Sequence, residues 1–221
     1  LKTDITMQTN SDCEIIIHLY IKFGIEHTLQ LLDGVFSFVL LDSRNIGGDY
    51  KLYTARDPYG IRPMYILKPK NHKSTQNTTF GFASELKQLA PICIELNKMN
   101  KNITKHTVIY NIYQFLPGSY SEFILPFIKE TFWKMNKMNH SYHKIGFYTP
   151  LHICSENIPS SVPYQNILRD IRVHLQNAVE KRCSTSDRPI ACLLSGGLDS
   201  SLITALVNDY HVNNNLPRLE T

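Results

Sequence analysis

The amino-acid sequence predicts a mixed α/β chain, α+β overall, with a sheet of neighbouring strands followed by the start of a parallel α/β domain. Short apolar runs separated by turn residues fill the first half. An amphipathic helical pattern begins at Tyr164, and an apolar run at 189–195 leads through a glycine loop into another helical pattern. With 221 residues and 43% hydrophobic content, the chain can bury one sizeable core or two small ones.

Composition and charge exclude several classes of protein. The formal net charge is +4 with basic residues spread along the chain, so no nucleic-acid partner is expected. No apolar stretch approaches the ~20 residues that span a bilayer, and residues 1–10 lack a signal-peptide pattern, so no membrane association is expected. The five cysteines lie far apart without a CxxC pair, which argues against a disulfide framework or a zinc knuckle. This cysteine usage predicts a reducing, cytoplasmic location.

The first half predicts a helix followed by strands that are joined through turns. In SDCEIIIHLYIKFG, Ser11 or Asp12 can cap a helix and Gly24 can end it, so a helix is expected from about residue 12 to 23. Strands are expected at 35–41, at 50–57, in a run ending at 67 and at 80–84, and a short helix at 85–90. Asn- and Lys-rich stretches between residues 97 and 144 predict two surface loops around a fifth strand pair at 112–125.

The second half predicts a helix, a strand and a second helix. Residues 146–163 are rich in proline and serine and predict a linker between domains. A helix is expected at 164–183, because apolar residues recur on one face: Ile167, Leu168, Ile171, Leu175, Ala178 and Val179. A strand at 189–195 and a helix at 200–210 enclose the glycine loop.

The loop SGGLDSS, residues 195–201, has the chemistry of an anion site. Glycines let the backbone approach a ligand, and the free N–H groups and dipole at a helix start favour negative charge. The serine hydroxyls add donors, and Asp199 is expected to hold a magnesium ion that bridges phosphate oxygens. The pattern is not that of kinase or GTPase P-loops, because no Gly-Lys-Ser/Thr follows. The alternative is a plain Gly-Gly turn that an Asp or Ser caps.

The motif SGGLDS resembles that of the PP-loop ATP pyrophosphatases, in which the loop grips pyrophosphate. The segments SDCEIIIHLY, DGVFSFVLLD, TARDPYGIRPMY, FGFASELKQL and FLPGSY, in this order, resemble the glutaminase half of the asparagine synthetase family. The resemblance implies an Ntn-hydrolase-type, class II glutamine amidotransferase domain at 1–145, a linker at 146–163 and the start of a PP-loop domain at 164–221. It also implies that the whole enzyme makes asparagine from aspartate, ATP and glutamine through β-aspartyl-AMP, releasing AMP and pyrophosphate.

The resemblance also assigns residues. Asp12 matches the acid that holds the α-amino group of glutamine, although a helix cap is an equal alternative from the sequence alone. ATP-binding positions are matched by Leu193, Ser195, Gly196, Gly197, Leu198, Asp199 and Ser200, with Mg2+ at Asp199. Other motif positions are expected to be architectural: Arg56, Asp57, Gly60, Arg62, Pro63, Ser84 and Glu85. A homodimer of the whole enzyme is also expected.

One departure from the family pattern concerns the nucleophile, which in the family is a cysteine at the mature N-terminus. This chain begins with Leu1, and Cys13 is internal, so no residue is assigned as catalytic. The chain is therefore expected to be a fragment that lacks the first part of the amidotransferase domain and the last part of the synthetase domain. Alone, it is expected to be inactive. The alternatives are a β-lactam synthetase-like protein and a non-catalytic amidotransferase-like module.

Overall fold

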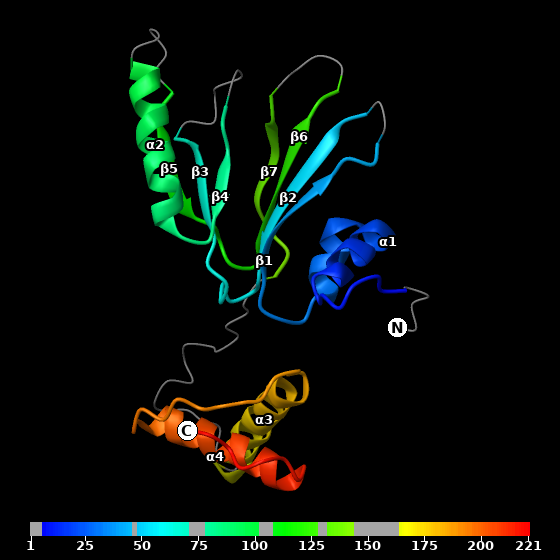
Figure 1. Cartoon of the computed structure of the whole chain (residues 1–221), viewed down its shortest axis with the longest axis vertical. Helices are drawn as coiled ribbons and strands as arrows, with labels where there is room; N and C mark the ends of the chain where they lie inside the picture. Colours follow the sequence, from blue (N-terminus) through cyan, green and yellow to red (C-terminus); the bar gives the residue numbers. More distant parts are fainter. Residues whose placement is uncertain (1–5, 46–47, 71–77, 102–107, 128–131, 144–163) are drawn as a thin grey trace. The chain divides into compact units, whose positions relative to one another are not determined.

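A computed structural model describes residues 6–45, 48–70, 78–101, 108–127, 132–143 and 164–221 (Figure 1). They fall into two compact units, Leu1–Gly146 and Phe147–Thr221. The expected linker at 146–163 lies outside the described residues. None of the helices in the described ranges has the length and apolar content needed to cross a membrane.

The first helix, α1 (Glu14–Leu31), extends further than the sequence predicts. Gly24, with φ +75° and ψ 173°, interrupts the helix where the end was expected. The helix then resumes, and the Thr28 hydroxyl donates to the Gly24 carbonyl at 2.7 Å. Ile25 and Leu29 of the resumed part are buried in the core of the unit. Burial of these side chains outweighs the glycine's tendency to end the helix.

A four-stranded antiparallel sheet has the order β1-β2-β6-β7. Its strands are β1 (Ser37–Asp42), β2 (Tyr50–Arg56), β6 (Ser119–Leu125) and β7 (Lys134–Ser141). The expected hairpin between the first two strands is confirmed, with Leu40 opposite Tyr53. The expectation of a surface loop over residues 134–141 is wrong, because β7 pairs with β6. The lysines and asparagines of β7 made its sequence look like a loop, but an edge strand tolerates such polar residues.

A second sheet has the order β4-β3-β5. It contains β3, which was expected to lie in the same sheet as β2. Its strands are β3 (Tyr65–Pro69), β4 (Gly81–Ala83) and β5 (Tyr110–Gln114). The expected pair within 112–125 is also wrong, because β5 pairs with β3 whereas β6 pairs with β2. The turn at Gly118, where φ is +60°, separates the two strands.

Helix α2 (Leu86–Lys101) runs through Pro91 and is much longer than the predicted 85–90. A proline inside a helix removes one backbone hydrogen bond. The helix continues because Leu89 is buried against the second sheet, with Cys93 and Leu96 packed beside it. Tertiary packing therefore sets the length of α2.

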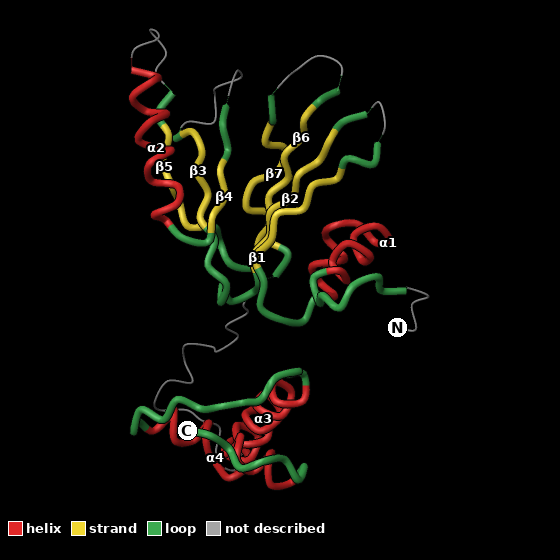
Figure 2. The backbone as a smooth tube through the Cα atoms, in the orientation of Figure 1, coloured by secondary structure: helices red, strands yellow, loops and turns green. Residues whose placement is uncertain are grey.

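Three apolar clusters define the layers of the first unit. The first joins α1 to the outer face of the four-stranded sheet, through Tyr20, Tyr53 and Tyr120. The second fills the space between the sheets: Met64, Ile66, Phe115 and Phe123, with Leu52, Phe80, Phe82, Trp133 and Met135 packed against them. The third joins α2 to the three-stranded sheet. The unit is therefore a four-layer sandwich of helix, sheet, sheet and helix, as Figure 2 shows.

The turn after β2 is built on two buried charged residues, Arg56 and Asp57, which bond backbone groups. Arg56 donates to the carbonyls of Arg62, Gly60 and Phe115 at 2.8, 2.6 and 2.6 Å. The Asp57 carboxylate accepts the N–H groups of Tyr59, Ile61 and Arg62 at 3.0 to 3.1 Å. These contacts agree with the expected architectural role of Arg56 and Asp57. Each of the two side chains holds backbone groups of the turn, and the structure gives no bond between them.

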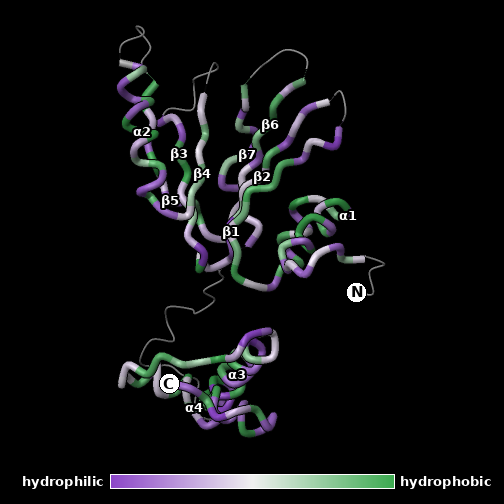
Figure 3. Tube along the Cα trace, viewed as in Figure 1, coloured by the Kyte–Doolittle hydropathy of each residue, from purple (hydrophilic) through white to green (hydrophobic). Residues whose placement is uncertain are grey.

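The second unit contains α3 (Tyr164–Ser184) and α4 (Leu198–Asn213), joined by loops that Figure 3 colours largely hydrophobic before α4. The two helices pack around Val179, Cys183, Val207 and Leu219. The expected strand at 189–195 is reduced to one parallel bridge between Ala191 and Glu220, with the Cys192 N–H donating to the Glu220 carbonyl at 2.9 Å. The predicted apolar face of α3 is only partly covered by described residues, since Leu168, Ile171 and Ala178 are exposed whereas Val179 is buried.

We expect Gly60→Ala to destabilise the first unit by about 2 to 4 kcal/mol, because the φ of +65° strains any other residue and a Cβ would lie 2.8 Å from Pro117 and 2.9 Å from the Arg56 guanidinium. Urea unfolding followed by fluorescence of Trp133, the sole tryptophan, measures this loss. Gly34→Ala is the matched control, because its Cβ would meet open space. Equal losses in both variants would contradict the role given to this turn.

Candidate functional site

The glycine loop forms an open helix N-terminus. Gly196 adopts a φ of +82°, and Gly197 is the N-cap of α4 with φ −79° and ψ 163°. The first helical bond runs from the Ser201 N–H to the Gly197 carbonyl at 3.1 Å. The N–H groups of residues 198–200 precede that bond and have no carbonyl partner within the helix. No side chain caps this end, so these donors are available to an anionic ligand.

Two serine hydroxyls lie close together in the glycine loop. The oxygens of Ser195 and Ser200 lie 2.9 Å apart, and Ser200 also donates to the Gly197 carbonyl at 3.1 Å. A Cβ on Gly197 would come within 3.6 and 3.9 Å of these two oxygens. These hydroxyls lie beside the free N–H groups, and each can turn its single O–H from its present partner toward a ligand.

The remaining expected ATP residues surround the loop and face solvent. Asp199 is exposed in the first turn of α4, and no described residue bonds its carboxylate. Leu193 and Leu198 are 95% and 83% exposed, which leaves apolar surface beside the anion site. In the described part of the chain, no three acidic, histidine or cysteine side chains gather as a metal site. The donor set therefore fits a magnesium ion only if phosphate oxygens supply most of its ligands.

Asp12 lies in the turn that precedes α1. The helix-cap alternative is wrong, because Cys13 occupies the N-cap position and no side chain makes a cap bond there. The Cys13 N–H donates instead to the Ser11 hydroxyl at 3.3 Å. The Asp12 carboxylate is exposed, and none of the described residues bonds it. It is free to bind a cation.

Glu14, two residues after Asp12, has hydrogen-bonding partners at both carboxylate oxygens. Its two oxygens accept the N–H groups of Gln8 and Thr9, each at 2.7 Å, and one also accepts the Thr9 hydroxyl at 2.5 Å. His18 Nε2 lies 3.0 Å from the other oxygen. The Thr9 hydroxyl, followed by the Gln8 N–H and His18, lowers the pKa of Glu14 from 4.5 to about 2. Two of these contacts are to backbone N–H groups, so the residue types in the sequence give no signal for them.

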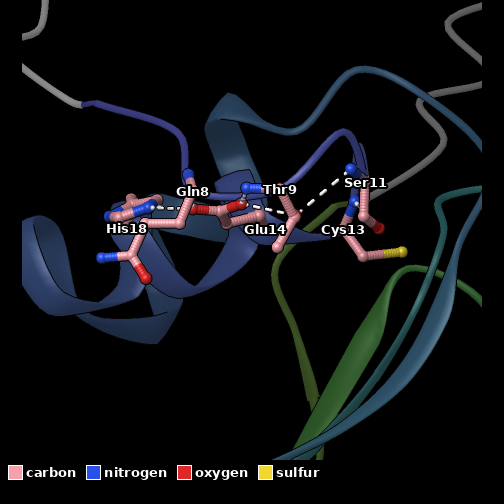
Figure 4. Close-up of polar contacts among 6 residues, drawn as sticks. All are labelled: Gln8, Thr9, Ser11, Cys13, Glu14 and His18. Carbon is pink, nitrogen blue, oxygen red and sulfur yellow. Dashed lines mark hydrogen bonds and ion pairs between the residues drawn. The ribbon is translucent and has the colours of Figure 1, made fainter.

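Cys13 does not form a nucleophile–base pair with His18. Figure 4 shows the Cys13 sulfur pointing away from Glu14 and His18. Cys93 donates to the Tyr110 carbonyl at 3.3 Å, and Cys183 is buried, with burial raising its pKa. These thiols lack the nearby base that nucleophilic catalysis requires.

A groove of about 420 Å³ between α1 and β1 was not predicted, because its walls come from two elements separated in the sequence. It is lined by Cys13, Ile16, Ile17, Tyr20, Ile21 and residues 38–44. Its charged groups, Asp42 and Arg44, bond each other at 2.8 Å. Asp12 does not line the groove, although the neighbouring Cys13 does.

Two family patterns match the chain. The pattern described as "Glutamine amidotransferase domain" covers residues 1–142, and the one described as "Asparagine synthase" covers residues 170–220. The first match spans well over half of the 221 residues. The chain belongs to the glutamine amidotransferase domain family. This membership agrees with the four-layer first unit and confirms the expected fold class, an Ntn-hydrolase-type amidotransferase sheet followed by the start of a PP-loop domain.

The names of several similar proteins combine asparagine synthesis with glutamine hydrolysis. The glutamine-hydrolyzing asparagine synthetases of Homo sapiens and Mus musculus are 38% identical over 204 and 202 residues, covering 90% of this chain and 31% of each relative. The Gallus gallus enzyme is 38% identical over 205 residues, covering 90% of this chain and 32% of the relative. The amidotransferase chain thus spans about a third of the length of these relatives.

The Glu14 contacts predict a pH dependence for the segment before α1. Because folding lowers the pKa of Glu14 from 4.5 to about 2, its ionised form stabilises this segment above pH 4.5, and the stabilisation is lost as the pH falls toward 2. Amide hydrogen exchange should therefore show Gln8 and Thr9 protected at pH 4. In Glu14→Gln the protection should be weak at every pH. Loss of protection already at pH 4 in the unaltered chain would contradict the assignment.

Proposed function

We propose that this chain contributes to ATP-dependent asparagine synthesis, in which ammonia from glutamine amidates aspartate through β-aspartyl-AMP and AMP and pyrophosphate are released. The observation that carries the proposal is the uncapped, hydroxyl-lined helix start at residues 195–200 in a chain whose first unit belongs to the glutamine amidotransferase domain family. The names of the relatives, glutamine-hydrolyzing asparagine synthetases, support the same reaction.

In this proposal the glycine loop binds the phosphates of ATP. The free N–H groups at 198–200 and the hydroxyls of Ser195 and Ser200 hold pyrophosphate oxygens, and Asp199 holds Mg2+ together with them. The exposed Leu193 side chain lies beside the loop as a contact for adenine. In adenylation a side-chain carboxylate oxygen of aspartate attacks the α-phosphorus of ATP and displaces pyrophosphate, which gives β-aspartyl-AMP. Ammonia can then attack its acyl carbon, with AMP as the leaving group. The loop favours adenylation by stabilising the negative charge on the departing pyrophosphate.

Asp12 is proposed to bind the α-ammonium group of glutamine, because its carboxylate is exposed and unengaged beside the saturated Glu14. The proposed domain limits remain 1–145, 146–163 and 164–221. We also propose a homodimer of the whole enzyme, glutamine, aspartate and ATP as substrates, and a cytoplasmic location without nucleic-acid or membrane partners.

Two other functions were open from the sequence. A β-lactam synthetase-like reaction has less support, since the names of the relatives give asparagine synthetases. A non-catalytic, nucleotide-binding module is favoured by one observation, namely that Cys13 points away from His18. This module would bind nucleotide through the same loop, so detection of reaction products from the whole protein separates it from the enzyme.

We expect Ser200→Ala and Ser195→Ala each to weaken binding of magnesium pyrophosphate to the 221-residue chain roughly tenfold, because each removes a hydroxyl donor to a charged ligand. Isothermal titration calorimetry measures the affinity. Ser184→Ala is the matched control, since that hydroxyl donates to the Lys181 carbonyl at 3.1 Å, outside the loop. Unchanged affinity in the two loop variants would overturn the phosphate-binding role.

We expect the purified polypeptide of residues 1–221 to hydrolyse no glutamine, and to form no asparagine from it, because the thiols of Cys13, Cys93 and Cys183 lack a nearby base. Product analysis by mass spectrometry, with the double variant Ser195→Ala, Asp12→Ala as background, measures both activities. Glutamate or asparagine above that background would show that the chain is active alone.

A further inference from the structure

We infer that Glu14 is a positioning residue for Asp12. Its carboxylate fastens residues 8–13, which we call the acid turn, to the start of α1 and so fixes where the Asp12 carboxylate meets the α-ammonium group of a ligand. The inference rests on the proposed glutamine-binding role of Asp12.

The hydrogen bonds of the acid turn close a loop around Asp12. Glu14 lies after Asp12 in the sequence, and it accepts N–H groups from Gln8 and Thr9, which lie before it. The Thr9 hydroxyl donates to Glu14 and accepts the Ser11 N–H at 3.2 Å, and the Cys13 N–H donates to Ser11. The contacts fix the backbone on both sides of Asp12, whose exposed carboxylate has no bonding partner among the described residues.

The carboxylates of Asp12, in the acid turn, and of Glu14, just after it, therefore have different roles. Glu14 has its charge offset by two N–H groups, a hydroxyl and an imidazole, and its side chain is 11% exposed. Asp12 is open to solvent. Ordering the acid turn before a ligand arrives removes an entropy loss that binding would otherwise carry, so the affinity for an ammonium group increases. The longer side chain belongs at position 14, because it has to reach back to Gln8.

A double-mutant cycle on the 221-residue chain tests this coupling. NMR titration with L-glutamine measures its Kd for the unaltered chain, Asp12→Asn, Glu14→Gln and the double variant. We expect Glu14→Gln to raise the Kd roughly three- to tenfold, and to have no further effect once Asp12 is replaced. Glu95→Gln on α2 is the matched control, because its exposed carboxylate has no bonding partner in the described part of the chain. Trp133 fluorescence verifies that each variant is folded.

A second ligand distinguishes positioning from general loosening. Glutaramic acid is glutamine without its α-amino group, so Glu14→Gln should reduce the preference for L-glutamine over it. Equal weakening of both ligands, or additive effects in the cycle, would overturn the inference. If the unaltered chain binds L-glutamine and Glu14→Gln binds it equally well, the inference alone fails. If the unaltered chain binds no L-glutamine, the proposed glutamine site fails first and the inference falls with it.

Discussion

A buried guanidinium joins the two sheets of the amidotransferase unit. Arg56 ends β2 in one sheet, and its side chain donates to the carbonyl of Phe115, just after β5 of the other sheet. The adjacent Asp57 carbonyl accepts the Gly118 N–H at 2.9 Å, at the turn into β6. These charged groups are buried at low cost because each is satisfied by several backbone partners. The sandwich and its apolar interior depend on this junction.

A similar interaction, a carboxylate that accepts backbone N–H groups, also orders the acid turn. At Asp57 and at Glu14, a carboxylate gathers backbone N–H groups of a short segment and fixes its conformation. The glycine loop before α4 is the opposite case, because no side chain satisfies its N–H groups. The turns at Asp57 and Glu14 therefore have their N–H groups bonded by carboxylates, whereas the Asp12 carboxylate and the open helix start keep polar groups available for the proposed ligands.

Local patterns in the sequence predicted the elements whose partners lie nearby. The β1–β2 hairpin and helix α3 follow from alternation, turn residues and helical spacing, and both form. The split into two sheets could not be predicted, because β6 pairs with β2 across more than sixty residues. Strand β7 was hidden because an edge strand needs little apolar character. Helix α1 continues past Gly24 because burial of Leu29 outweighs the local signal to stop.

For the candidate sites, the sequence by itself determined the residue types on which the proposed chemistry rests. The glycines, hydroxyls and acid of the loop at 195–200 can be read from residue types and their spacing, whereas Asp12 is assigned through the resemblance to the family. Only the tertiary structure decided that Asp12 is not a helix cap and that Glu14 organises the turn around it. The reason is that Glu14 bonds backbone N–H groups, which nearly every residue possesses. Residue identity therefore cannot reveal such contacts, and the path of the backbone decides them.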